Sequence, residues 1–521
     1  TGGGAYTVAK ENLGTVPALV AGSSLLIDYT LTVAVSVTAG IAALTSAFPA
    51  LHPYRLWLCL AAVTGILLAN LRGVRESAAI FAGPVYLFIV SAYVVIGGVV
   101  RYAISGAAVP PAEAASAPTA GVVWNVALVF LVLRAFASGC AALTGIEAVA
   151  TGVKIFKEPA SRNSALTLYI LAFMLGTLFF GITVLAYLYN VTPVAGETVL
   201  SQLGKIVFGR GTIYFVIQGA TMLILILAAN TSFTGFPRLA SVMAADRFVP
   251  RQLANLGDRL VYSNGILLLA AGAAALIWFF DANVHNLIPL YMVGVFTAFT
   301  LSQTGMVLHW RRHAGARGRG WRIGVNAFGA LTTGVVLVVV AVVKFTHGAW
   351  LILGAIPALV VVNWQLRKHY FQVGRDLSLA DYQKPEPLRH TAVVPVAGMN
   401  KMVLVALEYA QSISKDVIAV TVNTGTESRE QLLEQWHARV PDIPLVVLNS
   451  PYRSIYRPLL RFIDEVEAWR DDDVVTVVIP EFVPSKWWHA LLHNQTSLFL
   501  KGALLFKPHI IVTSVPHHLA R

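Results

Sequence analysis

The sequence predicts an α-helical polytopic membrane protein followed by a C-terminal α/β domain of the doubly wound class. Of the 521 residues, 56% are hydrophobic and only 12% are charged, whereas soluble globular proteins average about 25% charged residues. Near residue 376 the pattern changes from long apolar runs to alternating short strand-like and helix-like segments, which predicts a separate α/β domain. Most of the chain before that point must therefore contact lipid.

Ten apolar stretches, each long enough to cross a bilayer, lie between turn-rich breaks. They cover residues 16–48, 56–71, 78–104, 122–150, 164–189, 212–236, 262–280, 285–309, 323–344 and 348–366. The fourth is too long for one regular helix, and Ser138-Gly139 and Thr144-Gly145 interrupt it. We therefore expect a transmembrane transporter domain over residues 1–370. Because the sequence opens at Thr1, in an apparent loop or broken helix and without an initiator Met, we expect it to be part of a longer protein.

The basic residues predict the orientation in the membrane. If the first short segment is cytoplasmic, the inner loops before residue 376 contain 18 Lys and Arg residues and the outer loops contain 5. The five outer residues are Arg55, Arg101, Lys205, Arg210 and Lys344. Lys and Arg accumulate on the cytoplasmic side of membrane proteins, so both ends of the chain are expected in the cytoplasm. The net charge of +12 thus reflects orientation rather than nucleic-acid binding.

The C-terminal part contains five β-rich runs separated by helical ones. The runs are 391–396, 417–423, 445–448, 474–479 and 509–513, and amphipathic helices fit 401–414 and 453–469. This alternation predicts a doubly wound parallel sheet. Residues 371–390, with the polar segment Arg375–Arg389 and the prolines Pro385 and Pro387, form the predicted linker, and the domain itself covers 391–521.

The sequence lacks the motifs of several functional classes. No G-x-x-x-x-G-K-[ST] motif occurs, so the chain has no P-loop for an ATP-driven pump. No His/Cys metal cluster and no nucleophile elbow occur either, and the two cysteines, Cys59 and Cys140, lie in apolar runs rather than in a disulfide framework. We therefore expect no enzyme and no cofactor, and any transport must be secondary.

One ionisable residue lies deep in the first apolar stretch. Asp28, Thr32 and Ser36 follow one another at intervals of four residues, which puts them along one face of a helix. A charged side chain in a span costs about 2.5–3.5 kcal/mol or more, so each is a hypothesis of function. Carboxylate and hydroxyl oxygens are hard ligands that suit a dehydrated cation. The alternative is a polar stripe bonded to neighbouring helices or to its own helix backbone.

The fourth apolar stretch carries a second polar group at its interruptions. Two glycine-containing breaks followed by Glu147 favour a discontinuous helix, where transporters bind ions and substrates. Thr144 and Glu147 are therefore candidate ligands, and Glu147 is also a candidate carrier of a coupled proton. The alternative is a kinked helix with Glu147 in a salt bridge near the cytoplasm. Arg134 either pairs with a carboxylate or extends outward.

A third polar cluster, Asn230 to Arg238, lies at the end of the sixth apolar stretch. Its hydroxyl groups suit the completion of an ion site. An equally good interpretation is a helix end that leads into a cytoplasmic loop.

These residues resemble those of the amino acid–polyamine–organocation (APC) superfamily, whose transporters share a LeuT-like inverted repeat. The matching pieces are Gly3–Tyr6 before the family's third helix, Thr144-Gly145-Ile146-Glu147 in its broken sixth helix, and Lys157-Glu158-Pro159 after it. Within the superfamily the chain is similar to the KimA-type potassium importers, a group related to the KUP transporters. The segments Ala229–Leu239 and Asp246–Arg251 also have that group's pattern.

This resemblance implies a secondary active potassium importer of the cell membrane that works as a K⁺/H⁺ symporter. The group's potassium ligands map onto Asp28, Thr32, Ser36, Thr144 and Glu147. Asp28 or Glu147 would then carry the coupled proton. The cytoplasmic domain would resemble a universal stress protein, form a homodimer and bind cyclic di-AMP as an inhibitor.

The sequence departs from the family pattern at its start. The family's first two helices have no counterpart, and the first of them would supply an Asp and a Tyr to the cation site. Some amino-acid members use a membrane-embedded Lys in the fifth helix, and the corresponding stretch Ser77–Gly98 contains none. This difference disfavours their mechanism.

Two alternative functions stay open. An amino-acid/proton symporter of the same fold is the first, since a fold does not decide the substrate. A membrane sensor with a transport-dead core is the second. The residues that bind a nucleotide are not assigned, although the turns Ala397–Asn400 and Asn449–Arg457 follow strands, where doubly wound sheets bind ligands. Arg453 and Arg457 are candidates for contact with a phosphate.

Overall fold

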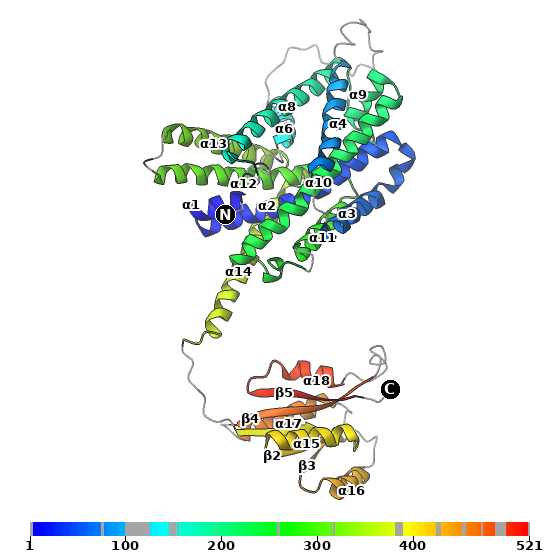
Figure 1. The fold of residues 1–521 in the computed structure, drawn as a ribbon, viewed down its shortest axis with the longest axis vertical. Helices are drawn as coiled ribbons and strands as arrows, with labels where there is room; N and C mark the ends of the chain where they lie inside the picture. The colour runs from blue at the N-terminus through cyan, green and yellow to red at the C-terminus, as the bar shows by residue number, and fades with distance from the viewer. Residues whose placement is uncertain are drawn as a thin grey trace. The chain divides into compact units, whose positions relative to one another are not determined.

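The computed structural model describes most of the chain in two compact units, Thr1–Leu377 and Ser378–Arg521 (Figure 1). The described residues are 4–73, 78–98, 126–143, 145, 149, 153, 156–194, 196–257, 261–313, 315, 318–380, 389–423, 429–450, 455–469, 473–484 and 496–518.

The described part of the first unit is helical. Its α-helices are α1 Gly4–Asn12, α2 Thr15–Ala47, α3 Arg55–Leu71, α4 Ala78–Ile96, α6 Val126–Gly139, α8 Ala160–Leu188, α9 Val199–Phe208, α10 Thr212–Ala245, α11 Ser263–Phe279, α12 Val284–Arg312, α13 Arg319–Val343 and α14 Ala349–Asp376. Short 3₁₀ turns are η1 Pro49–Tyr54, η2 Cys140–Leu143, η4 Arg251–Leu253 and η5 Phe345–His347. A helix lies in each of the ten predicted spans, and within the described residues seven helical segments are long and apolar enough to cross a membrane. The prediction of a helical polytopic membrane protein is confirmed.

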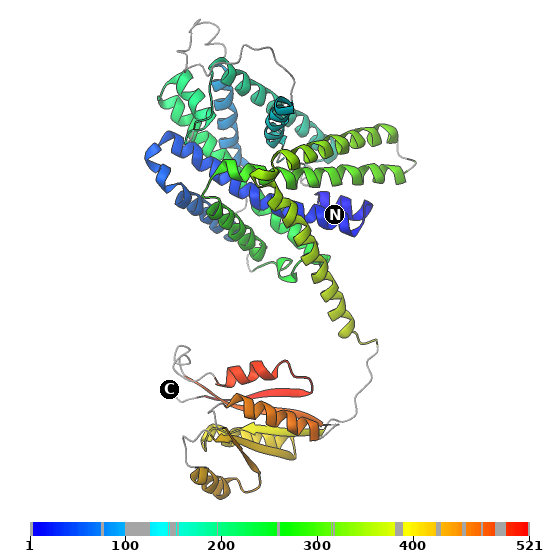
Figure 2. The ribbon, with the colours of Figure 1, turned by 180° about the vertical axis from the view of Figure 1, so that it is seen from behind.

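Helix α2 crosses the centre of the first unit (Figures 1 and 2). It contacts α10 and α12 most extensively, and also α1, α3, α11 and α14. Glycines on both helices let α10 approach α2 closely, as small residues do in membrane helices. A Cβ on Gly22 would lie 2.9 Å from the Met243 side chain, and one on Gly235 would lie 2.7 Å from the Tyr29 ring. These contacts place α2 and α10 side by side in antiparallel directions.

Helix α10 is longer than the sequence suggested. The predicted end near residue 236 is wrong, because the helix continues through Pro237 to Ala245. Proline in a helix removes one backbone hydrogen bond, but the following turns bury Leu239, Ala240 and Met243. Pro237 itself packs against α11, where a Cβ on Gly265 would lie 3.0 Å from the Pro237 Cβ. Burial therefore sustains the helix beyond the polar cluster.

Three further elements differ from the predicted boundaries. Residues from Gly4 onward are helical in α1, which ends at Asn12 before α2 begins at Thr15, so of the two predicted alternatives the broken helix is found rather than the loop. Helix α14 continues through Asp376, into the segment predicted as linker. The short helix α9 lies between two spans and was not predicted; the Thr198 side chain caps it by accepting from the Ser201 amide, as N-cap residues do.

The second unit contains a five-stranded parallel sheet in the order β3-β2-β1-β4-β5. The strands are β1 Arg389–Pro395, β2 Asp416–Asn423, β3 Leu445–Asn449, β4 Asp473–Val483 and β5 Ile510–His518. In the register, Val393 of β1 pairs with Ile418 of β2 and with Val477 of β4. This order confirms the prediction of a doubly wound parallel sheet.

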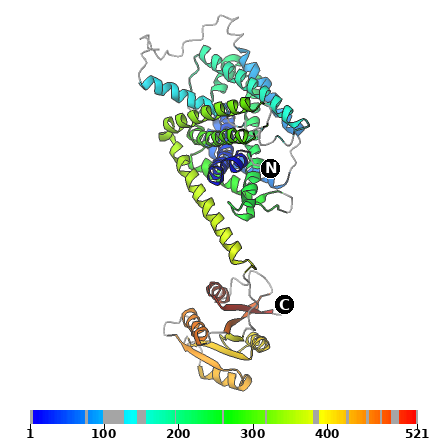
Figure 3. The ribbon, with the colours of Figure 1, turned by 90° about the vertical axis from the view of Figure 1, so that its left-hand side faces the viewer.

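Helices cover both faces of this sheet (Figure 3). They are α15 Lys401–Ile413, α16 Arg429–Arg439, α17 Tyr456–Trp469 and α18 Thr496–Leu504. Helices α15 and α16 bury Leu407 and Trp436 against one face. Helices α17 and α18 bury Ile463 and Leu504 against the other. The strand order reverses between β1 and β4, because β2 and β3 lie on one side of β1 whereas β5 lies beyond β4. Doubly wound sheets bind ligands in the crevice outside the carboxyl ends of the strands at such a point.

Candidate functional site

The centre of the candidate site is the buried carboxylate of Asp28 on α2. The residue is 0% exposed, and it faces the backbone of α12 at Gly294. A Cβ added to Gly294 would lie 3.7 Å from the Asp28 Cβ and 3.1 Å from the Ser24 carbonyl oxygen. The absence of a side chain at Gly294 thus allows α12 to approach α2 at the level of Asp28. A carboxylate in such surroundings is costly unless a cation, a proton or hydrogen bonds compensate for the lost hydration.

Thr32 and Ser36 continue from Asp28 along the same helix. Ser36 is 9% exposed and Thr32 is half-buried. The neighbouring hydroxyls of Thr30 and Thr38 donate to the carbonyl oxygens four residues earlier, at 2.9 Å and 2.6 Å. Such back-bonding is the ordinary state of a hydroxyl in an apolar helix. The structure therefore places the three predicted ligands on one helix face; their role as ligands stays a prediction.

Ser24 extends this face by one more turn. It precedes Asp28 by four residues and is fully buried, and among the described residues its hydroxyl has no hydrogen-bond partner. Most buried hydroxyls in proteins have such a partner. Ser24 was not among the predicted ligands, although its spacing from Asp28 repeats the interval of four residues that links Asp28, Thr32 and Ser36.

A second buried hydroxyl comes from α10. The helix pair is antiparallel, with Gly235 against Tyr29 and Gly40 against Leu225, so Ser232 lies level with Thr32. Ser232 is 1% exposed, and its hydroxyl finds no partner within the part of the chain that the structure describes.

The rest of the third polar cluster has structural contacts. Asn230 accepts a hydrogen bond from the Asn70 side chain of α3 at 2.7 Å. Thr231 and Thr234 are exposed and donate to their own helix at 2.7 Å and 2.8 Å. Only Ser232 of this cluster is thus a new candidate ligand.

The predicted break in the fourth span begins at the first of its two expected positions. Helix α6 ends at Gly139 and continues as the 3₁₀ turn η2. The Ser138 hydroxyl donates to the Arg134 carbonyl at 3.0 Å, and the Arg134 side chain is exposed. Gly145 has a φ of 89°, which is left-handed backbone. Thr144 and Glu147, the other two predicted ligands, lie outside the described residues.

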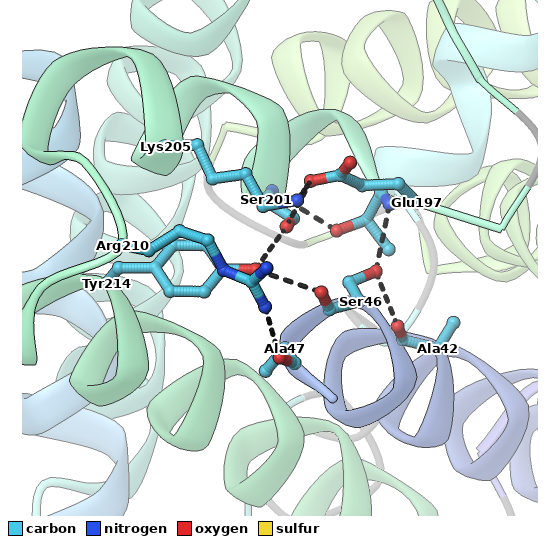
Figure 4. Close-up of polar contacts among 9 residues, drawn as sticks. Ala42, Ser46, Ala47, Glu197, Ser201, Lys205, Arg210 and Tyr214 are labelled. Atoms are coloured by element: carbon cyan, nitrogen blue, oxygen red, sulfur yellow. Dashed lines mark hydrogen bonds and ion pairs between the residues drawn. The ribbon is translucent and has the colours of Figure 1, made fainter. Parts of the chain in front are cut away.

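A polar network fastens the outer end of α2, by the predicted orientation, to α9 and α10 (Figure 4). Tyr214 of α10 places its hydroxyl 2.8 Å from Ser201 Oγ and 3.1 Å from the carbonyl oxygen of Ser46 on α2. Ser201 donates to Glu197 Oε1 at 2.7 Å. The Thr198 amide donates to Ser46 Oγ at 3.1 Å. Three elements thus share one set of hydrogen bonds.

Two basic residues complete this outer network. Lys205 Nζ lies 2.6 Å from Glu197 Oε1, and its ammonium is 5.9 Å from the centre of the Tyr214 ring. Arg210 donates to the carbonyl oxygen of Ala47 at 3.0 Å, at the last turn of α2. A cation at a helix C-terminus is favourable because carbonyl groups there lack partners in the helix.

A second network holds α1 to the inner end of α10. The Tyr6 hydroxyl of α1 donates to Asp246 Oδ2 at 2.6 Å, and Lys10 Nζ donates to Asp246 Oδ1 at 2.5 Å. Asp246 is the C-cap residue of α10. Burial, followed by the hydrogen bond to Asp246, raises the pKa of the Tyr6 phenol above its ordinary value. Tyr6 therefore stays a neutral donor over the physiological range.

Helix α14 packs against the segment that follows α10 through arginine–aromatic contacts. The Arg367 guanidinium lies 4.6 Å from the centre of the Phe248 ring, and that of Arg251 lies 4.8 Å from the Tyr370 ring. The Tyr370 hydroxyl also accepts from the Arg251 amide at 3.2 Å. Such contacts contribute about 0.5–1 kcal/mol each at exposed sites. They connect the segment after α10 to α14, the last helix of the first unit.

Comparison with known proteins gives matches over both units. The amino acid permease family matches residues 1–362, and the KimA potassium transporter C-terminal domain matches residues 388–517. The chain is 44% identical to Potassium transporter KimA of Bacillus subtilis (strain 168) over 527 residues, which cover 100% of this chain and 85% of that protein. The division between the units at Leu377 falls between the two family matches.

Proposed function

Because the chain belongs to the amino acid permease family and to the group of its KimA relative, we propose that it is a secondary transporter that imports potassium across the cell membrane. The observation that carries the proposal is the fully buried Asp28 on a helix face of hydroxyl groups. Hydroxyl and carboxylate oxygens replace the water shell of a hard cation. The name of the relative, a potassium transporter, selects potassium among such cations.

In this proposal potassium is ligated by Asp28, Thr32 and Ser36 on α2 and by Thr144 and Glu147 after the break that follows α6. Ser24 and Ser232 join this set, because both are buried and their hydroxyls lack a partner among the described residues. Rocking of one helix bundle against the other would then open the site first outward and then inward. The outer and inner networks at the two ends of the α2–α10 pair are the contacts that such a motion must break in turn.

Uptake is proposed to be coupled to protons, with Glu147 or Asp28 as the carrier. A buried carboxylate needs either a cation or a proton to balance its charge. If the carboxylate exchanged a proton for a potassium ion within the transport cycle, potassium uptake would be coupled to the proton gradient.

The second unit is proposed to be a cytoplasmic regulatory domain that forms a homodimer and binds cyclic di-AMP as an inhibitor. Its match to the KimA C-terminal domain supports this role. The predicted turn Ala397–Asn400 follows β1, at the crevice between β1 and β4 where doubly wound sheets bind ligands. The turn after β3 follows an edge strand, which makes it the weaker candidate. Of the two arginines proposed there, Arg457 is exposed and Arg453 lies outside the described residues.

Reconstituted protein tests the proposed function directly. Purified protein in liposomes should take up potassium or radioactive rubidium, and an inward proton gradient should accelerate uptake. The Asp28→Asn variant should abolish uptake, whereas Thr30→Val, which removes a hydroxyl already bonded to the Leu26 carbonyl, should not. Uptake of labelled amino acids without potassium uptake would overturn the proposal.

An amino-acid/proton symporter remains the second candidate, because the amino acid permease family matches residues 1–362 of the membrane unit. The same liposomes distinguish the two functions, since each substrate can be offered alone. A sensor with a transport-dead core is the third candidate. Nucleotide binding without flux of either substrate would favour it.

A further inference from the structure

A buried lysine lies beside the break in the fourth span. Lys344 follows the last residue of α13 and precedes the turn that leads to α14. Its side chain reaches α6, where Nζ donates to Ser138 Oγ at 2.8 Å. Lys344 is only 9% exposed. A lysine is seldom buried to this degree without a charged partner.

No carboxylate of the described residues neutralises this ammonium. The ion pairs in that part of the chain do not include Lys344. The sequence around it offers none, because residues 282–375 contain neither Asp nor Glu. Arg134, one turn before Ser138, adds a further positive charge nearby. Within the described residues, an explanation for the position of the ammonium must therefore come from neutral oxygen atoms such as Ser138 Oγ.

The end of α6 supplies that explanation. Helix α6 ends at Gly139, one residue after Ser138. Although the chain continues there as the 3₁₀ turn η2, each carbonyl group at the end of α6 has a second lone pair, and the end of the helix carries a partial negative charge. In transporters with broken helices, such half-helix C-termini ligate the coupling cation. The Ser138 hydroxyl adds an oxygen atom, and it is already oriented because it donates to the Arg134 carbonyl.

We infer that Lys344 is a tethered cation that occupies the C-terminal end of α6 and keeps the transported cation out of this position. An ammonium is a monovalent cation that binds oxygen atoms, as potassium does, so the two compete for the same oxygen ligands. By its charge it also weakens the binding of any cation nearby. Lys344 is thus a residue that determines the apparent affinity for the transported ion, and this inference rests on the proposed function.

Equilibrium binding of potassium to the purified full-length protein tests this role. The Lys344→Met variant keeps the length of the side chain but removes its charge, so the dissociation constant for potassium should fall about threefold or more. The Lys344→Arg variant keeps the charge and should bind potassium as the wild type does. Lys368→Met removes the same charge from an exposed position on α14, outside the outer and inner networks, and should leave the dissociation constant unchanged.

Thermal unfolding separates this role from a purely structural one. A lysine that only fastens α13 to α6 would lower the unfolding temperature when replaced by Met, with no change in potassium affinity. Unchanged or weaker binding by folded Lys344→Met would overturn the inference. If that variant does not fold, Lys344→Gln replaces it, because glutamine retains a hydrogen-bond donor toward Ser138. Unchanged or weaker potassium binding by Lys344→Gln would likewise overturn the inference. Absence of potassium binding and uptake in the wild type would instead overturn the proposed function.

Discussion

Gly294 of α12 lies against Asp28 of α2, so that a single methyl group at Gly294 would come within 3.7 Å of the Asp28 Cβ and 3.1 Å of the Ser24 carbonyl oxygen. Small residues at helix contacts let membrane helices approach closely. Here the approach encloses the one buried carboxylate on α2. The glycine thus determines both the packing of the two helices and the space around the proposed ion site.

A larger side chain at position 294 should impair potassium uptake more strongly than it impairs folding. Gly294→Ala places its Cβ at a distance to the Ser24 oxygen that is tighter than ordinary contact, and overpacking of this kind costs about 1–3 kcal/mol. We expect lower potassium uptake together with a lower unfolding temperature, and larger losses for Gly294→Leu. The matched control is Gly354→Ala on α14, where a Cβ would meet no atom within 4 Å. Equal behaviour of the two alanine variants would contradict the proposed role of the contact.

Replacing Ser24 by Ala tests whether its hydroxyl ligates potassium, because the loss of a ligand lowers the potassium affinity without lowering the stability. Its buried hydroxyl has no hydrogen-bond partner among the described residues, and a buried polar group without a partner costs about 1–3 kcal/mol. Ser24→Ala should therefore leave the unfolding temperature unchanged or raise it in the absence of potassium. If the hydroxyl ligates potassium, the same variant should lower the potassium affinity several-fold. Unchanged affinity in Ser24→Ala, measured by equilibrium binding, would remove Ser24 from the site.

Thr32 and Thr38 form a matched pair on α2. Thr38 donates to the Ala34 carbonyl at 2.6 Å, whereas the described residues give no hydrogen bond to the hydroxyl of the half-buried Thr32. Replacement of either by Val keeps the shape and removes the hydroxyl. Thr32→Val should weaken potassium binding about tenfold, the loss of one ligand oxygen worth roughly 1.4 kcal/mol. Thr38→Val should leave it unchanged. The opposite order would place the ligand face on the other side of the helix.

The sequence predicted the helices well and part of the polar face of α2, whose role as a ligand face stays a prediction. Periodicity at intervals of four identified Asp28, Thr32 and Ser36, because that interval is a property of one helix alone. Ser24 has the same spacing, but a lone serine in an apolar helix is ordinarily bonded to its own backbone, so the sequence could not show that its hydroxyl lacks a partner. The role of Gly294 depends on which helix lies opposite, and no local pattern contains that information.

One wrong prediction and two sets of contacts that the sequence did not indicate have a related physical origin. The polar run from Asn230 onward, with Pro237 inside it, has the composition of a helix end, yet α10 continues because its next two turns are buried against neighbouring helices. The Tyr6–Asp246 contact joins residues 240 positions apart, and the Glu197 network joins α9 to the distant end of α2. Such contacts follow from tertiary packing, which a single sequence does not specify by its periodicity.

The Tyr6–Asp246 contact predicts a specific dependence of stability on alkaline pH. The pKa of the Tyr6 phenol is raised in the folded protein, first by burial and then by its bond to Asp246, while an unfolded chain has a tyrosine pKa of about 10. The stabilisation from this group is therefore complete below pH of about 10 and is lost as the pH rises through the higher folded value. Tyr6→Phe should destabilise the protein by about 1.5–3 kcal/mol at neutral pH, the net value of a hydrogen bond to a charged group.

Thermal unfolding of wild type and Tyr6→Phe across neutral and alkaline pH measures this dependence. The difference between them should be constant at neutral pH and shrink above pH of about 10, because only the wild type has a hydroxyl proton to lose. Tyr54→Phe, at a residue that is 60% exposed, removes a phenol without a buried hydrogen bond and should match the wild type at neutral pH. A Tyr6→Phe difference that grows with pH would mean that the phenol ionises more readily in the folded protein than in the unfolded chain. The hydrogen bond to Asp246 would then not hold α1 to the end of α10 as described.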